Sequence, residues 1–289
     1  MFDTIAIVGV GLIGGSFGLA LKRAGFTGRI LGVSSAAALE AALERGAIDA
    51  GLALEEAAPQ ADLVYLAQPI RRILQTLARL DPLVKPGALV TDAGSTKTRI
   101  VEAGRQLRRA QFLGGHPMAG KETRGAAEAE AGLFRGRTYV LTPSDPAEME
   151  TTAAREFMGW LRAAGAMPLV LDAAAHDRIV AHTSHLPQLL STALAASLLE
   201  RLRPEDLRVA GPGLADMTRL AASPYDIWGD ILETNREAIE PALAALIARL
   251  EQLRAHLADA APAEQFRLAN EFAARLKREL KFAPARSLQ

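Results

Sequence analysis

The sequence contains no cysteine, which excludes disulfide bonds, thiolate nucleophiles and cysteine-ligated metal ions. Neither charge is in excess, with 33 basic and 33 acidic side chains, so the long basic face of a nucleic-acid-binding protein is not expected. Long apolar runs are absent as well, because the least polar stretch, residues 186–199, is too short for a membrane span and contains Ser191, Thr192 and Ser197. We therefore expect no nucleic-acid partner and no membrane insertion.

The first residues lack a basic segment ahead of an apolar run, so we expect no signal peptide and a cytoplasmic protein. Short apolar strands alternate with helices up to residue 171, and long helical patterns follow. Strands are predicted at residues 4–8, 29–33, 62–66, 88–92, 138–141 and 168–171, and helices at 17–23, 37–45, 70–80 and 146–163. This order predicts an α/β fold: a Rossmann-type, doubly wound, mostly parallel sheet over residues 1–171, then an all-helical dimerisation domain over residues 172–289.

A glycine-rich turn joins the first predicted strand to the first helix. Gly9, Gly11 and Gly14 have the spacing G-x-G-x-x-G. In a dinucleotide-binding turn the first glycine permits the tight bend, the second lets the backbone approach a pyrophosphate, and the third lets helix and strand pack closely. This context favours a cofactor site over a turn without ligand. The residues predicted to bind the cofactor are Gly9, Gly11, Leu12, Ile13, Gly14, Ser34, Ser35, Gln68, Pro69 and Ser95.

Ser34 and Ser35 follow the second predicted strand, where an NAD-selective enzyme carries an acid that binds the ribose 2′-hydroxyl. Without that acid nothing repels a 2′-phosphate, although no arginine follows directly to bind one. The cofactor is therefore NADP or NAD, with NADP favoured.

His116 is the leading candidate for catalysis. It lies in Gly115-His116-Pro117-Met118-Ala119-Gly120, which we expect to be a short rigid connection, because Pro117 fixes its own φ and restricts the residue before it. A buried structural histidine is the alternative. Ser95 follows another predicted strand end, where ligands of such sheets bind. It has a second interpretation as the cap of a helix beginning at Thr96.

The helical half offers fewer candidates. His182 and His185 are three residues apart but lack a third metal ligand, so no metal site is predicted. Arg219 suits either a substrate carboxylate or an ion pair with Asp216. Trp228 is compatible with a plain core position. Leu243, Leu246, Ile247, Leu250, Leu253 and Leu257 recur at helical spacing, and we expect this apolar stripe to form a homodimer contact.

These motifs together resemble the prephenate and arogenate dehydrogenases of tyrosine biosynthesis. The resemblance covers essentially the whole chain and includes residues 9–14, 93–97, 115–120, 184–187 and 218–228. It implies NAD(P)-dependent oxidative decarboxylation of a cyclohexadienol, with His116 as the base, Ser95 sharing the substrate hydroxyl and Arg219 holding the ring carboxylate. For the base we expect an ordinary pKa of about 6.5.

The same resemblance makes His185, Gln188 and Trp228 candidate substrate-binding residues. Prephenate-using relatives often carry a histidine where this chain has Gln188, so we expect turnover of arogenate, with prephenate as a second substrate. Two alternatives stay open. A β-hydroxyacid or ketol-type dehydrogenase would be expected to use a lysine or carboxylates on the helical domain, and no lysine lies between Lys121 and Lys277. A non-catalytic dinucleotide sensor would bind cofactor without turnover.

Overall fold

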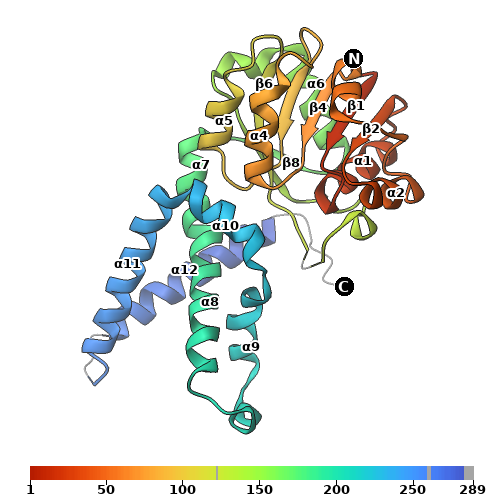
Figure 1. Ribbon diagram of the computed structural model, residues 1–289. Helices are drawn as coiled ribbons and strands as arrows, with labels where there is room; N and C mark the ends of the chain where they lie inside the picture. Colours follow the sequence, from red (N-terminus) through yellow and green to blue (C-terminus); the bar gives the residue numbers. More distant parts are fainter. Residues whose placement is uncertain (122, 259–261, 283–289) are drawn as a thin grey trace.

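The computed structural model describes residues 1–121, 123–258 and 262–282, and its core is an eight-stranded sheet (Figure 1). The strand order is β3-β2-β1-β4-β5-β6-β7-β8. The strands are β1 (Thr4–Val8), β2 (Arg29–Val33), β3 (Ala50–Gly51), β4 (Leu63–Leu66), β5 (Leu89–Asp92), β6 (Gln111–Pro117), β7 (Thr138–Thr142) and β8 (Met167–Val170).

The first six strands are parallel, and their order is that of a dinucleotide-binding Rossmann sheet. β-Branched and leucine side chains fill the central strands, which are buried on both faces, as a parallel sheet requires. β7 runs antiparallel to β6, pairing Val140 with His116, and β8 is parallel to β7. The predicted α/β fold is confirmed. The short strand β3 was not predicted, because two residues give no periodic pattern.

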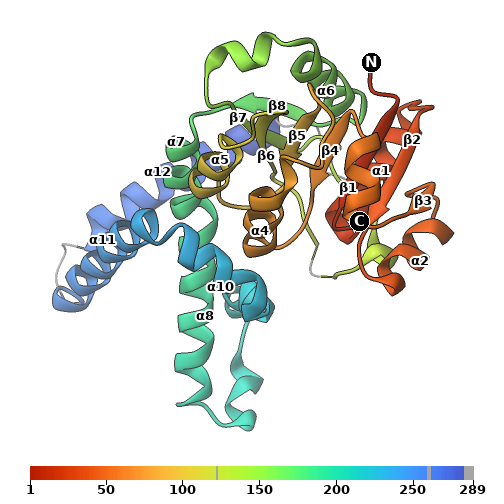
Figure 2. The same ribbon diagram turned by 45° about the horizontal axis from the view of Figure 1, so that its top comes forward.

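Helices cover both faces of the sheet (Figures 1 and 2). Phe17 of one helix and Phe157 of another belong to the buried cluster on one face, and Ile73 and Ile100 belong to the cluster on the other. The helices concerned are α1 (Leu12–Arg23), α2 (Ala36–Glu44) and α6 (Thr152–Ala163) on the first face, and α3 (Leu54–Ala57), α4 (Ile70–Leu80) and α5 (Thr98–Gly104) on the second. Short 3₁₀ turns occur at Ala58–Gln60, Ala126–Glu128 and Pro146–Glu150.

The second half of the chain is helical and extends away from the sheet (Figure 1). It contains α7 (Ala173–Val180), the π-helical turn η4 (Ala181–His185), α8 (Leu186–Leu199), a 3₁₀ segment (Pro204–Val209), α9 (Pro212–Thr218), the 3₁₀ turn η6 (Arg219–Ala222), α10 (Tyr225–Thr234), α11 (Arg236–Ala255) and α12 (Pro262–Phe282). The π-helical turn accommodates Pro187, which lies in the first turn of α8 and lacks an N–H. The last strand ends at Val170 and α7 begins at Ala173, while the domain division at residue 171 stays a prediction.

The predicted apolar stripe lies on α11, except for Leu257 just beyond its end, and is left partly uncovered by the chain itself. Ile247, Leu250 and Leu257 are 47, 46 and 77% exposed. On α12, Phe266 and Phe272 are 66 and 65% exposed. Over the described residues, no helix combines the length and apolar character needed to cross a membrane.

Candidate active site

The glycine turn after β1 has the geometry expected of a phosphate-binding turn. Gly9 has a φ of +95°, and a Cβ there would lie 2.5 Å from the Ala67 carbonyl oxygen. A Cβ at Gly14 would lie 2.2 Å from the Gly9 carbonyl oxygen, so this glycine permits close packing of α1 on the turn. A Cβ at Gly11 would meet no atom within 4 Å. The backbone at Gly11, at the N-terminus of α1, is therefore open to close approach by a ligand.

A cleft of about 440 Å³ opens beside this turn. Its lining includes Gly11, Leu12, Ile13, Gln68, Pro69 and Ser95 among the predicted cofactor residues, together with Ala119, Gly120, Arg124 and Asp226. Arg124 donates two hydrogen bonds to the Asp226 carboxylate, at 2.8 and 3.0 Å, and so links the loop after β6 to α10. The cleft therefore lies between the sheet and the helical half. Ser34 and Ser35 are exposed at the end of β2, outside this lining.

Ser95 is half-buried in this cleft, beyond the carboxyl end of β5. The interpretation of Ser95 as a helix cap is wrong, because α5 begins at Thr98 and Lys97 occupies its N-cap position. Ser95 lies in the turn between β5 and α5 and lines the cleft. Its neighbour Thr96 shares a 2.8 Å hydrogen bond with Thr234 at the end of α10.

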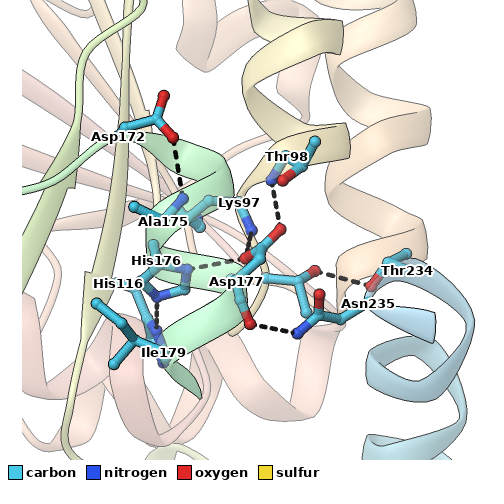
Figure 3. Close-up of polar contacts among 12 residues, drawn as sticks. Lys97, Thr98, His116, Asp172, Ala175, His176, Asp177, Ile179, Thr234 and Asn235 are labelled. Carbon is cyan, nitrogen blue, oxygen red and sulfur yellow. Dashed lines mark hydrogen bonds and ion pairs between the residues drawn. The ribbon is translucent and has the colours of Figure 1, made fainter. Parts of the chain in front are cut away.

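His116 lies within strand β6, not on a connection between elements as the sequence suggested. The reason is that β6 extends as far as Pro117, which is its last residue and pairs with the antiparallel strand β7. A proline, which has no N–H to donate, can occupy such a terminal position of a strand. The imidazole is only 9% exposed, and its Nδ1 atom lies 2.8 Å from Nε2 of His176 on α7 (Figure 3). Burial, and then the neighbouring His176, Lys97 and His185, lower the pKa of His116 well below its ordinary value.

His176 in turn contacts the carboxylate of Asp177, with Nδ1 2.8 Å from Oδ1 (Figure 3). The same Oδ1 atom accepts a hydrogen bond from the Lys97 amide at 2.7 Å, and Oδ2 accepts one from the Thr98 amide at 2.8 Å. Sequence reasoning missed both His176 and Asp177. The sequence did contain one signal for this pair: a histidine is followed directly by an aspartate in the helix after the last strand.

A buried ion pair fixes the backbone next to His116. Lys97 and Asp92 are both 0% exposed, and the Lys97 ammonium contacts the Asp92 carboxylate. Lys97 also donates a 2.6 Å hydrogen bond to the Gly115 carbonyl, and Asp92 accepts the Gly115 N–H at 3.0 Å. Burial lowers the pKa of Lys97, while Asp92 and then Asp177 favour its charged form. The pair therefore joins the ends of β5 and β6 at the residue before His116, and it was not predicted.

His185 and Trp228 reach the same region from the helical half. The Nδ1 atom of His185 lies 3.1 Å from Nδ2 of Asn235, which also donates to the Asp177 carbonyl at 2.9 Å. The His185 and Trp228 rings meet edge to face, with centroids 5.9 Å apart. Burial lowers the pKa of His185 to about 4, so the ring is neutral near pH 7. The structure thus connects His116, His185 and Trp228 through His176, Asp177 and Asn235.

Gln188 lies one turn further along α8 and is buried. Its side-chain amide nitrogen donates to the Leu220 carbonyl at 2.8 Å and to the Thr192 hydroxyl at 3.2 Å. Arg219 is the residue before Leu220 and is exposed in η6. A hydrogen bond therefore joins Gln188 to the backbone next to Arg219.

His182 lies on the same π-helical turn as His185, but it is exposed. Within the described ranges, no three His, Asp or Glu side chains are arranged to hold a metal ion.

Two family models match the chain. The prephenate dehydrogenase nucleotide-binding domain matches residues 17–163, and the prephenate dehydrogenase dimerization domain matches residues 172–273. The chain belongs to the prephenate dehydrogenase family. Prephenate dehydrogenase of Lactococcus lactis is 35% identical over 259 residues, which cover 88% of this chain and 69% of that protein.

Solved structures of the family have the same fold across nearly all of the chain. Prephenate dehydrogenase from A. aeolicus, crystallised with hydroxyphenyl propionate and NAD⁺, has a TM-score of 0.83 and 28% identity, covering 96% of this chain and 98% of that one. Synechocystis arogenate dehydrogenase has a TM-score of 0.79 and 31% identity, covering 96% and 99%. The resemblance predicted from the motifs is thereby confirmed at the level of family and fold.

Proposed function

We propose that this chain oxidises and decarboxylates arogenate, prephenate or both, using a nicotinamide dinucleotide, as a step of tyrosine biosynthesis. The single observation that supports this proposal best is the state of His116. Its ring is buried, its pKa is lowered, and one ring nitrogen is held by His176 at 2.8 Å. We assign the other ring nitrogen to the substrate. A neutral, fixed imidazole beside a cofactor cleft suits proton removal from a hydroxyl group.

The residues present fit a nicotinamide dinucleotide. Gly9 and Gly14 are packed against backbone and form the turn, while Gly11 leaves open space at the N-terminus of α1 for the phosphates. Gln68, Pro69 and Ser95 line the cleft further along the strand ends. When bound, the oxidised cofactor supplies a hydride acceptor. The exposed Ser34 and Ser35 at the end of β2 support NADP at least as well as NAD.

The chain's own residues deprotonate and orient the substrate. His116 takes the proton of the substrate hydroxyl as the carbinol carbon is oxidised. Ser95 forms a hydrogen bond with the same hydroxyl group. Arg219 holds the ring carboxylate that leaves as carbon dioxide, because a guanidinium group binds a carboxylate through two parallel hydrogen bonds. Since aromatisation supplies the driving force, the protein needs to orient the substrate, deprotonate it and exclude water.

Gln188 supports arogenate as a substrate. The Leu220 carbonyl can only accept a hydrogen bond, so the Gln188 group facing it at 2.8 Å is the NH₂ group. Thr192 engages the same nitrogen at 3.2 Å. The carbonyl oxygen of Gln188 is an acceptor only, and we propose that it faces the side chain of the substrate. It favours the ammonium group of arogenate over the keto oxygen of prephenate.

We also propose a homodimer formed through the helical half. Support comes from the match of residues 172–273 to a dimerization domain and from the exposed Ile247, Leu250, Phe266 and Phe272 on α11 and α12. An exposed apolar surface of this kind is stabilised by a second copy. Light scattering should give twice the mass of the 30.7 kDa chain, and a monomer at micromolar concentration would contradict the proposal. Location in the cytoplasm stays a prediction.

The decisive experiment measures cofactor reduction with arogenate and with prephenate, each with NAD and with NADP. Product identification separates tyrosine from 4-hydroxyphenylpyruvate. Turnover of at least one substrate with loss of carbon dioxide supports the proposal. Cofactor binding without turnover of either substrate would instead identify a dinucleotide sensor.

A further inference from the structure

His116, His176 and Asp177 form a continuous row of hydrogen bonds (Figure 3). The row begins in strand β6 and ends in helix α7, and each contact is 2.8 Å long. His176 and Asp177 are 1% and 4% exposed, so water does not compete for these contacts. Two buried polar side chains, His176 and Asp177, are therefore connected by hydrogen bonds to the candidate base.

The direction of each hydrogen bond follows from the chemistry of Asp177. Burial raises the pKa of its carboxyl, but hydrogen bonds from His176, Thr98 and Lys97 outweigh this effect and leave the pKa below its ordinary value. Asp177 is therefore a carboxylate near pH 7 and can only accept. A neutral His176 then donates from Nδ1, which leaves its Nε2 atom as an acceptor. His116 must then donate from Nδ1, and its Nε2 atom carries the free lone pair.

We propose that His176 and Asp177 are positioning residues that hold His116 in the tautomer whose Nε2 atom is unprotonated. The inference rests on the proposed function of His116 as the base. In the proton transfer, the substrate O–H bond breaks and an Nε2–H bond forms, so His116 becomes a cation. The Asp177 carboxylate stabilises that cation through His176, which is the arrangement by which a buried acid orients and supports a catalytic imidazole in other enzymes.

Asp177 is held firmly enough for this task. Two consecutive backbone amides at the start of α5, from Lys97 and Thr98, donate to its two oxygens at 2.7 and 2.8 Å. Asn235, between α10 and α11, donates to its backbone carbonyl at 2.9 Å. The start of α5 therefore fixes the carboxylate of Asp177, and Asn235 fixes its backbone.

The other charged and titratable groups around His116 do not replace Asp177. Lys97 lowers the pKa of His116, and its ammonium is already paired with Asp92. His185 is neutral near pH 7 because burial lowers its pKa to about 4. Among the residues that the structure describes, Asp177 is thus the carboxylate that reaches the base through a hydrogen-bonded partner.

The test is Asp177→Asn, read by ¹⁵N NMR of the histidine rings in the protein without substrate. Five histidines give few signals, and the loss of one set in His116→Asn assigns the base. In the unsubstituted protein we expect Nδ1 of His116 to be protonated and Nε2 to be bare. The asparagine NH₂ group can donate to His176, which reverses both hydrogen bonds and places the proton on Nε2 of His116. An unchanged His116 tautomer in folded Asp177→Asn would overturn the inference.

Kinetics give a second measure. Asp177→Asn should lower kcat by about 10²- to 10⁴-fold, the scale expected when a catalytic histidine is held in the wrong tautomer, with KM changed less than threefold. His182→Asn is the matched control, because His182 is exposed, and it should leave kcat within twofold. A loss of kcat below tenfold in Asp177→Asn would contradict the inference.

His176→Ala provides a variant that does not rely on Asp177. It leaves a space the size of one ring between His116 and Asp177, and free imidazole in the medium should restore kcat at least tenfold. Imidazole should not change the rate of His182→Ala. Absence of rescue in folded His176→Ala would overturn the inference. The NMR measurement needs no turnover, so it tests the positioning role even if the proposed function is wrong. Absence of turnover with both substrates would contradict the proposed function, whereas an unchanged tautomer would contradict the positioning role.

Discussion

The Nδ1 atom of His116 and the Nε2 atom of His176 lie 2.8 Å apart, although 60 residues separate them in the sequence. One residue belongs to strand β6 and the other to α7, the first helix after the sheet. The candidate base is therefore held jointly by the cofactor-binding sheet and the helical half. Any relative movement of the two halves would change the hydrogen bond that orients it.

Replacing the candidate base should remove turnover and leave binding intact. His116→Asn keeps a polar side chain of similar size but cannot accept the proton, so kcat should fall by about 10²- to 10⁴-fold. The dissociation constant of the substrate, measured by calorimetry, should change little. A variant that keeps more than a tenth of the original kcat would show that His116 is not the base.

The pH dependence of kcat/KM should differ from that of an ordinary histidine. Burial and neighbouring charges lower the pKa of His116 below 6.5, so the neutral, active form already predominates at pH 6.5. Activity should be lost only as the pH falls through the lowered pKa, and it should be flat between about pH 6.5 and 8. A rise in kcat/KM with a midpoint at or above 6.5 would contradict the lowered pKa.

The guanidinium of Arg219 should contribute to substrate binding more than to the chemical step. Arg219→Ala should raise KM by an amount equivalent to about 2–4 kcal/mol, with a smaller effect on kcat, because a charge-assisted pair with the ring carboxylate is lost. Arg254→Ala, at an exposed arginine of α11, is the control. Equal KM values for the two variants would remove Arg219 from the substrate site.

The side chain at position 188 should influence which substrate is preferred. Gln188→His replaces the acceptor oxygen with a ring that can donate, so relative kcat/KM should move towards prephenate by about 1–2 kcal/mol. Thr192→Val removes one partner of the Gln188 NH₂ group without changing the free oxygen, and the preference should stay. Strict use of prephenate by the unsubstituted enzyme, with no change in Gln188→His, would refute the assignment.

Cofactor preference should respond to charge at the end of β2. Ser34→Asp introduces an acceptor for the ribose 2′-hydroxyl and repels a 2′-phosphate, so the ratio of kcat/KM values should move towards NAD. Ala37→Asp adds the same charge at an exposed position further along α2 and should have a smaller effect. If both variants leave the ratio unchanged, a residue other than Ser34 recognises the ribose.

Local patterns in the sequence were sufficient for most of the sheet. The strands at 4–8 and 29–33 and the helix at 70–80 have the predicted bounds, because β-branched runs and a 3.6-residue periodicity are local properties. The antiparallel direction of β7 was not predicted, since nothing in residues 138–142 records which way the strand runs. The start of α5 at Thr98 and the position of His116 inside β6 also differ from the prediction, because both depend on contacts with neighbouring strands.

The sequence by itself determined the family, the α/β class, the glycine turn and the candidates His116, Ser95 and Arg219, because these reside in short motifs with fixed spacing. Only the tertiary structure showed that His176 and Asp177 lie behind His116, and that Lys97 and Asp92 form a buried pair beside it. These relationships join residues up to 60 positions apart. They arise when parallel strands end at one edge of the sheet and a helix from the second half packs against that edge, which no local pattern of residues encodes.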